Sequence, residues 1–158
     1  MAKSRLTTAQ RRKLLNVVAD FIEPLPRKKL DMDVFGVETD FVDPSGGRLV
    51  SVGPTMHDCG TAGCALGWAV SIPAVAAAGL APKNLLGVGD PWKIAAKTFG
   101  IDEHLSIVLF GHGRRGHRTP AQVAKNLRYA AKTGKPAPAL RAAYAKEKRD
   151  AEDDRAND

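Results

Sequence analysis

Aromatic residues, cysteines and long apolar segments are all scarce in this sequence. Aromatics make up 6% of the 158 residues and there are two cysteines, which excludes a disulfide-stabilised scaffold. No apolar run approaches the ~18 residues of a membrane-spanning helix. The segment from Met1 to Leu6 is charged and lacks the apolar stretch of a secretory signal. We therefore expect a cytoplasmic protein without a membrane partner.

The remaining composition is close to that of an average globular protein. Hydrophobic residues make up 44% of the chain and charged residues 26%, and a chain of this length typically buries one core. We expect a single compact domain over residues 1–134, followed by a charged tail over residues 135–158 that is either helical or frayed. The predicted fold class is α+β, predominantly helical, with five or six short helices and one β-hairpin.

Acidic residues are missing from one long stretch, between His104 and Lys146. The chain has 24 Lys and Arg against 17 Asp and Glu, a net charge of +7, and this stretch concentrates the excess. Such a block attracts polyanions, although a solvated helix face has the same composition. The acidic end from Glu147 to Asp158 either folds back to screen the block or frays. The basic residues of the block are Arg114, Arg115, Arg118, Lys125, Arg128, Lys132, Lys135, Arg141 and Lys146.

The first third of the chain predicts a helix and then a β-hairpin. Thr7 and Gln10 have capping-box spacing, and the apolar residues that follow recur at helical intervals up to Ile22. Two segments rich in β-branched residues, Val37 to Val42 and Arg48 to Gly53, flank a turn rich in proline and glycine. This arrangement is typical of a β-hairpin.

Helix boundaries dominate the second half of the chain. Asp90, followed by a proline, begins a helix that Gly100 ends, and Asp102 begins the next one. Thr119, followed by a proline and by Gln122 at capping-box spacing, begins a further helix that ends at a glycine. One side of this last helix is basic, with Lys125, Arg128 and Lys132 at steps of three and four residues.

A segment rich in small residues carries both cysteines. A thiol at a helix start, such as Cys59, has a lowered pKa and is a candidate nucleophile, with His57, His104, His112 or His117 as its base. His57, Cys59 and Cys64 are also weak candidates for a metal site, because only one close ligand pair is present. The simplest interpretation is that both cysteines are small buried residues packed around Trp68.

A glycine and arginine loop precedes the basic helix. Gly111, Gly113 and Gly116 have the spacing of a dinucleotide-binding motif, but the first acidic residue after them is Glu147, too distant to bind a ribose. Backbone amides, a helix N-terminus and guanidinium groups instead suggest a phosphate cradle, and the alternative is a plain surface loop. Tyr129 and Phe110 are the only nearby aromatics, which argues against a specialised single-strand binder.

The chain resembles a group of small uncharacterised proteins of bacteria and their phages. The resemblance covers residues 10–133 and is carried by residues in four segments. It implies a compact, mainly helical domain in a phage setting, and it implies no catalytic residue. The matching residues are Leu30, Asp31 and Met32; Cys59, Gly60, Thr61, Cys64, Gly67 and Ala69; Leu109 and Phe110; and Thr119, Pro120, Val123, Ala124 and Leu127.

These observations favour binding over catalysis. We expect a small accessory protein that binds nucleic acid or a phosphorylated ligand and needs no cofactor. One alternative is a thiol-dependent hydrolase or transferase that uses Cys59, and another is a phage-type interaction module that disables a host protein. The expected anion-binding residues are Arg114, Arg115, Arg118, Lys125, Arg128 and Lys132.

Overall fold

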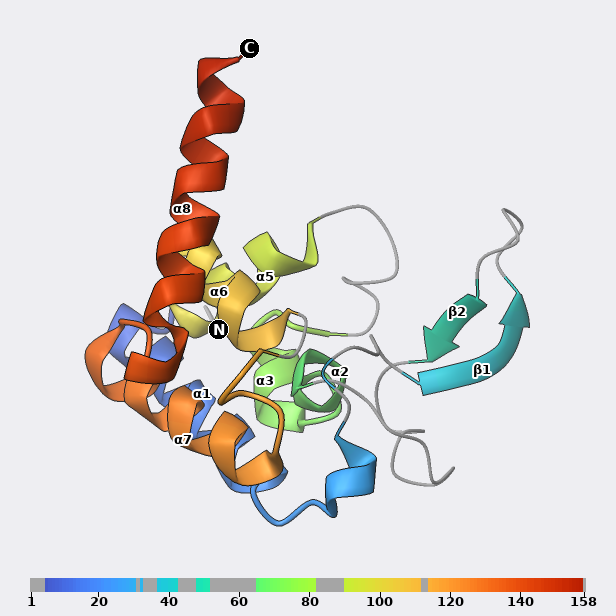
Figure 1. Cartoon of the computed structure of the whole chain (residues 1–158). Helices are drawn as coiled ribbons and strands as arrows, with labels where there is room; N and C mark the ends of the chain where they lie inside the picture. The colour runs from blue at the N-terminus through green and yellow to red at the C-terminus, as the bar shows by residue number, and fades with distance from the viewer. Residues whose placement is uncertain are drawn as a thin grey trace.

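A computed structural model describes residues 5–30, 32, 37–42, 48–51, 65–81, 90–111 and 114–157. Helices gather into one body, and the last of them, α8, extends away from it (Figure 1). The α-helices are α1 (Thr8–Ile22), α2 (Ala65–Ala69), α3 (Pro73–Ala77), α5 (Pro91–Phe99), α6 (Glu103–Phe110), α7 (Pro120–Thr133) and α8 (Arg141–Ala156). Two 3-10 turns, η1 (Arg27–Lys29) and η3 (Pro138–Leu140), complete the helical part.

The core lies between α1 and α7 and extends to the other helices. One cluster of completely buried side chains joins the two helices, with Leu15 and Val18 on α1 and Val123 and Leu127 on α7. Trp68 belongs to the same cluster and is only 2% exposed. Helices α1 and α7 both begin at capping boxes, Thr7 with Gln10 and Thr119 with Gln122, which confirms the helix starts predicted from the sequence. Capping satisfies the free amides of a first turn, so these ends are well defined.

The predicted α+β class is wrong. In the part of the chain whose side chains the structure describes, helices and their connections form the whole core, and the predicted β-hairpin is not seen there. The backbones of β1 (Val37–Val42) and β2 (Arg48–Ser51) form an antiparallel pair. The side chains of these two segments are not among those that the structure describes, so the pair supplies no layer of the described core. Local β preference does not decide a fold class, because a class depends on which layers bury the core. The described residues hold seven α-helices, more than predicted.

Gly100 ends α5 at a place where another helix leaves no room for a side chain. Its φ of +63° lies in the left-handed region, and a Cβ there would lie 3.0 Å from the backbone oxygen of Thr8. Gly100→Ala should therefore lower the free energy of unfolding by about 1–2 kcal/mol or more, measured by urea denaturation. Gly134→Ala is the matched control, because its φ is +67° but its Cβ would meet the flexible end of Arg12. A loss for Gly100→Ala no larger than for Gly134→Ala would contradict this packing.

The chain after α7 turns back and docks before α8 leaves the body. Ala137 and Leu140 are buried in the turn, and the hydroxyl of Tyr144 donates a hydrogen bond of 2.8 Å to Asp102 at the start of α6. Burial and this carboxylate raise the pKa of Tyr144 to about 12. The division of the chain at residue 134 stays a prediction.

Candidate anion-binding site

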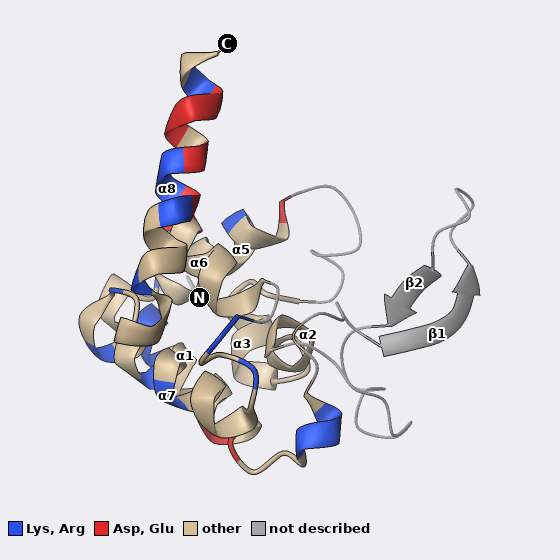
Figure 2. Ribbon diagram, in the orientation of Figure 1, with Lys and Arg blue, Asp and Glu red and all other residues tan. Residues whose placement is uncertain are grey.

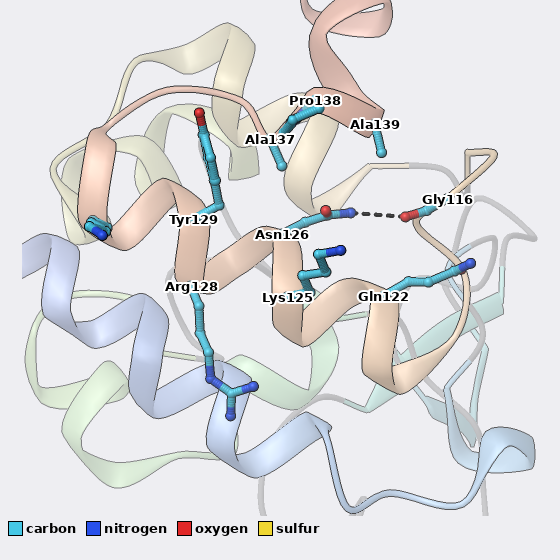
Figure 3. Close-up of a pocket in the computed structure, with 10 residues that line it drawn as sticks. Gly116, Gln122, Lys125, Asn126, Arg128, Tyr129, Ala137, Pro138 and Ala139 are labelled. Atoms are coloured by element: carbon cyan, nitrogen blue, oxygen red, sulfur yellow. Dashed lines mark hydrogen bonds between the residues drawn. The ribbon is translucent and has the colours of Figure 1, made fainter.

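A groove of about 560 Å³ runs between α7 and the segment that leads into α8 (Figure 3). Both walls come from sequence positions close together, because the chain reverses direction after Gly134. Residues of α7 form one wall, and the turn before α8 forms the other. The lining residues are Gln122, Lys125, Asn126, Arg128, Tyr129 and Lys132 on α7, with Ala137, Pro138, Ala139 and Gly116 opposite.

Two of the predicted anion-binding arginines are already held by carboxylates. Arg128 leans away from the groove toward α1 (Figure 3), where its Nη2 lies 2.8 Å from Asp20 and 2.7 Å from Glu23. These hydrogen bonds raise the pKa of Arg128, and the bond from Arg128 lowers the pKa of Glu23. The Nη2 atom of Arg114 lies 3.1 Å from Glu147, at the point where α8 passes the loop. Both arginines therefore hold parts of the fold together.

The other predicted residues lie on the surface. Arg115, Arg118, Lys125 and Lys132 are exposed, and within the described ranges no acidic residue lines the groove beside the two lysines. Figure 2 shows Lys and Arg recurring along α7, whereas α8 carries both signs of charge. Of the acidic end, Glu147 reaches back to the block through Arg114. The groove side of α7 therefore carries the positive charges of Lys125 and Lys132.

The predicted phosphate cradle at the start of α7 is partly occupied by the protein itself. The side-chain oxygen of Gln122 accepts hydrogen bonds from the backbone amides of Arg118 and Thr119, at 3.1 and 3.2 Å. Thr119 in turn accepts from the amide of Gln122 at 3.2 Å. Amides engaged in a capping box are not free to bind an anion. These three amides are therefore not available to a ligand.

A buried histidine anchors the loop before α7. His117 is completely buried, and its Nε2 donates to the carbonyl oxygen of Leu109 at 2.7 Å. Its Nδ1 therefore accepts from the amide nitrogen of Asn126, which lies 2.8 Å away. Burial lowers the pKa of His117 to about 4, assisted by the charge of Arg114 and opposed by the bond to Leu109. A neutral imidazole thus ties the end of α6 to the middle of α7.

From the sequence, His117 is a possible base for Cys59 and a member of the glycine and arginine loop, whereas a role for Asn126 was not predicted. No spacing rule connects these two residues, since the pair joins a loop to a helix nine positions further on. A lone polar residue on the apolar side of α7 was the only available sign, because Asn126 falls between Val123 and Leu127.

The predicted thiol and metal sites lie outside the described residues. His57, Cys59, Cys64 and His112 all fall there, so both hypotheses stay predictions. Among the residues that are described, no three His, Cys, Asp or Glu side chains gather as metal ligands. The search of those same residues found no helix with the length and apolar character needed to cross a membrane.

Comparison with known proteins adds no relative. No protein-family model, curated protein or solved structure matches the chain. The resemblance to bacterial and phage proteins stays a prediction, and the geometry of the groove is the basis for inferring function.

Proposed function

We propose that the protein binds a polyanion, nucleic acid or another phosphorylated ligand, along the groove of α7. The observation that carries this proposal is the pair of exposed lysines, Lys125 and Lys132, on a groove whose described lining contains no carboxylate. Arg115 and Arg118, on the loop before α7, are exposed as well. Cations of this kind contact phosphate groups and not base edges, so the binding is largely independent of nucleotide sequence.

The proposed contact set is smaller than the set predicted from the sequence. Arg114 and Arg128 have strong intramolecular partners, and a ligand would have to displace a carboxylate to reach either of them. Lys125 and Lys132 line the groove, and together with the exposed Arg115 and Arg118 they are the residues that we assign to the ligand. The two paired arginines hold the loop and α7 in place.

The proposal predicts strong dependence of affinity on salt. Four phosphate contacts release about four counterions, so affinity should fall by about 10²-fold between about 50 and 200 mM salt. Fluorescence anisotropy with duplex DNA, single-stranded DNA and RNA measures this change. An affinity that does not respond to salt, or no binding to any of the three at the lower concentration, would contradict the proposal.

A further inference from the structure

Asn126 presents a single unused hydrogen-bonding atom to the groove. The residue is 3% exposed, and its amide nitrogen donates to the carbonyl oxygen of Gly116 at 3.0 Å and to Nδ1 of His117. Both partners can only accept here, since the other ring nitrogen of His117 donates to Leu109. The orientation of the amide is therefore determined. Its Oδ1 atom has no partner among the described residues, and Figure 3 shows Asn126 beside the groove.

The surface around this oxygen combines apolar walls with cations. Tyr129 lines the groove opposite Pro138, and its hydroxyl accepts a hydrogen bond from Arg141 at 3.3 Å, which restrains the ring. The other nearby aromatic, Phe110, is buried and stacked on Phe99, and is unavailable to a ligand. A volume of about 560 Å³ lies within the range of about 300–1,000 Å³ that is typical of small-ligand pockets.

A ligand that matches these groups needs three features. It needs an N–H donor for the oxygen of Asn126, an apolar planar part for the side of the groove that holds Tyr129, and negative charge for Lys125 and Lys132. Bare phosphate chains lack the planar part and would bring negative charge to a carbonyl oxygen, which is unfavourable. A nucleobase joined to a phosphate has all three features.

We infer that the groove binds one nucleotide unit, with an N–H group of its base on Oδ1 of Asn126 and its phosphate between Lys125 and Lys132. This inference rests on the proposed function and narrows it to a ligand class. The unit is either a free nucleotide or an unpaired nucleotide within nucleic acid. One aromatic ring serves one base, so the groove differs from the extended stacking surface of a dedicated single-strand binder.

The test compares a short single strand of adenine nucleotides with an abasic strand of the same length, since both carry the same charge. We expect the wild-type protein to bind the adenine strand at least about tenfold more tightly in fluorescence anisotropy. Ala139→Trp, which fills the groove, should remove the preference for the adenine strand over the abasic strand. Ala142→Trp is the matched control, because Ala142 is exposed on α8 and does not line the groove.

Tyr129→Leu is a second variant that keeps every charge, and it should reduce the preference as well. Equal binding of the two strands by the wild-type protein would overturn the nucleotide inference while the polyanion proposal stands. Failure to bind either strand at about 50 mM salt would overturn both. Competition by adenosine diphosphate distinguishes a free nucleotide from a nucleotide within nucleic acid as the ligand. If adenosine diphosphate displaces the adenine strand at a concentration similar to that of strand binding, the ligand is a free nucleotide. If it does not displace the strand at that concentration, the ligand is nucleic acid.

Discussion

Reversing the charges of Lys125 and Lys132 to glutamate is expected to lower the affinity for nucleic acid by at least about 100-fold at low salt. The double substitution replaces two positive charges on the groove with two negative ones. Each unit of charge near a phosphate contributes on the order of 1 kcal/mol at a surface, and 100-fold corresponds to about 2.8 kcal/mol. Both side chains are exposed, so the fold should be unaffected. Anisotropy titration measures the loss.

Arg128 provides a sharp control for this prediction. It lies on the same helix as Lys125, but its guanidinium group is bound by Asp20 and Glu23 on α1. Lys125→Gln should weaken binding severalfold at about 150 mM salt, where charges beyond about 8 Å are screened. Arg128→Gln removes the same charge and should change affinity little, while it lowers stability by up to about 1 kcal/mol through lost surface ion pairs. Equal losses of affinity would show that net charge alone governs binding.

The second large effect is a loss of stability on mild acidification. His117 has its pKa lowered to about 4 in the folded protein, against about 6.5 in the unfolded chain. The unfolded state therefore binds more protons between these values, and stability is complete above pH 6.5 and falls as the pH approaches 4. This group alone should remove about 2 kcal/mol from the free energy of unfolding between pH 7 and pH 5. Urea denaturation at the two values measures the change.

Two variants separate His117 from the other titrating groups. His117→Gln should be less stable at pH 7, because Gln fits the bonds to Leu109 and Asn126 poorly, but it should lose little further stability at pH 5. His104→Gln, which changes a partly exposed histidine of α6, should keep the wild-type dependence on pH. If His117→Gln loses as much stability on acidification as the wild-type protein, the buried histidine is not the responsible group.

Sequence reasoning identified the helices where local chemistry determines the backbone. Thr7 with Gln10, Asp90, Gly100, and Thr119 with Gln122 mark helix ends in the sequence, and the structure places them at those ends. Such signals act over three or four residues, so they are readable without knowledge of the fold. The prediction of an α+β fold class was wrong because two segments with β-forming residues do not show by themselves which elements bury the core.

Long-range pairing was beyond the reach of sequence reasoning. In the sequence, Lys125 and Arg128 are equivalent cations on one basic side of α7. The structure distinguishes them because Arg128 pairs with Asp20 of α1, which lies 108 positions away in the chain. The groove likewise depends on the chain reversal that sets Ala137 and Pro138 opposite α7. Tertiary packing therefore decides which charges remain available to a ligand.

The location of the ligand on α7 is the central claim, and amide chemical-shift mapping tests it most directly. The protein labelled with ¹⁵N is titrated with a short single-stranded oligonucleotide at low salt. We expect the largest shifts on the amides of residues 122–132 and of Ala137 and Ala139, on both walls of the groove. Shifts confined to the basic turn η1 (Arg27–Lys29) and to α8, with the walls of the groove unchanged, would contradict it.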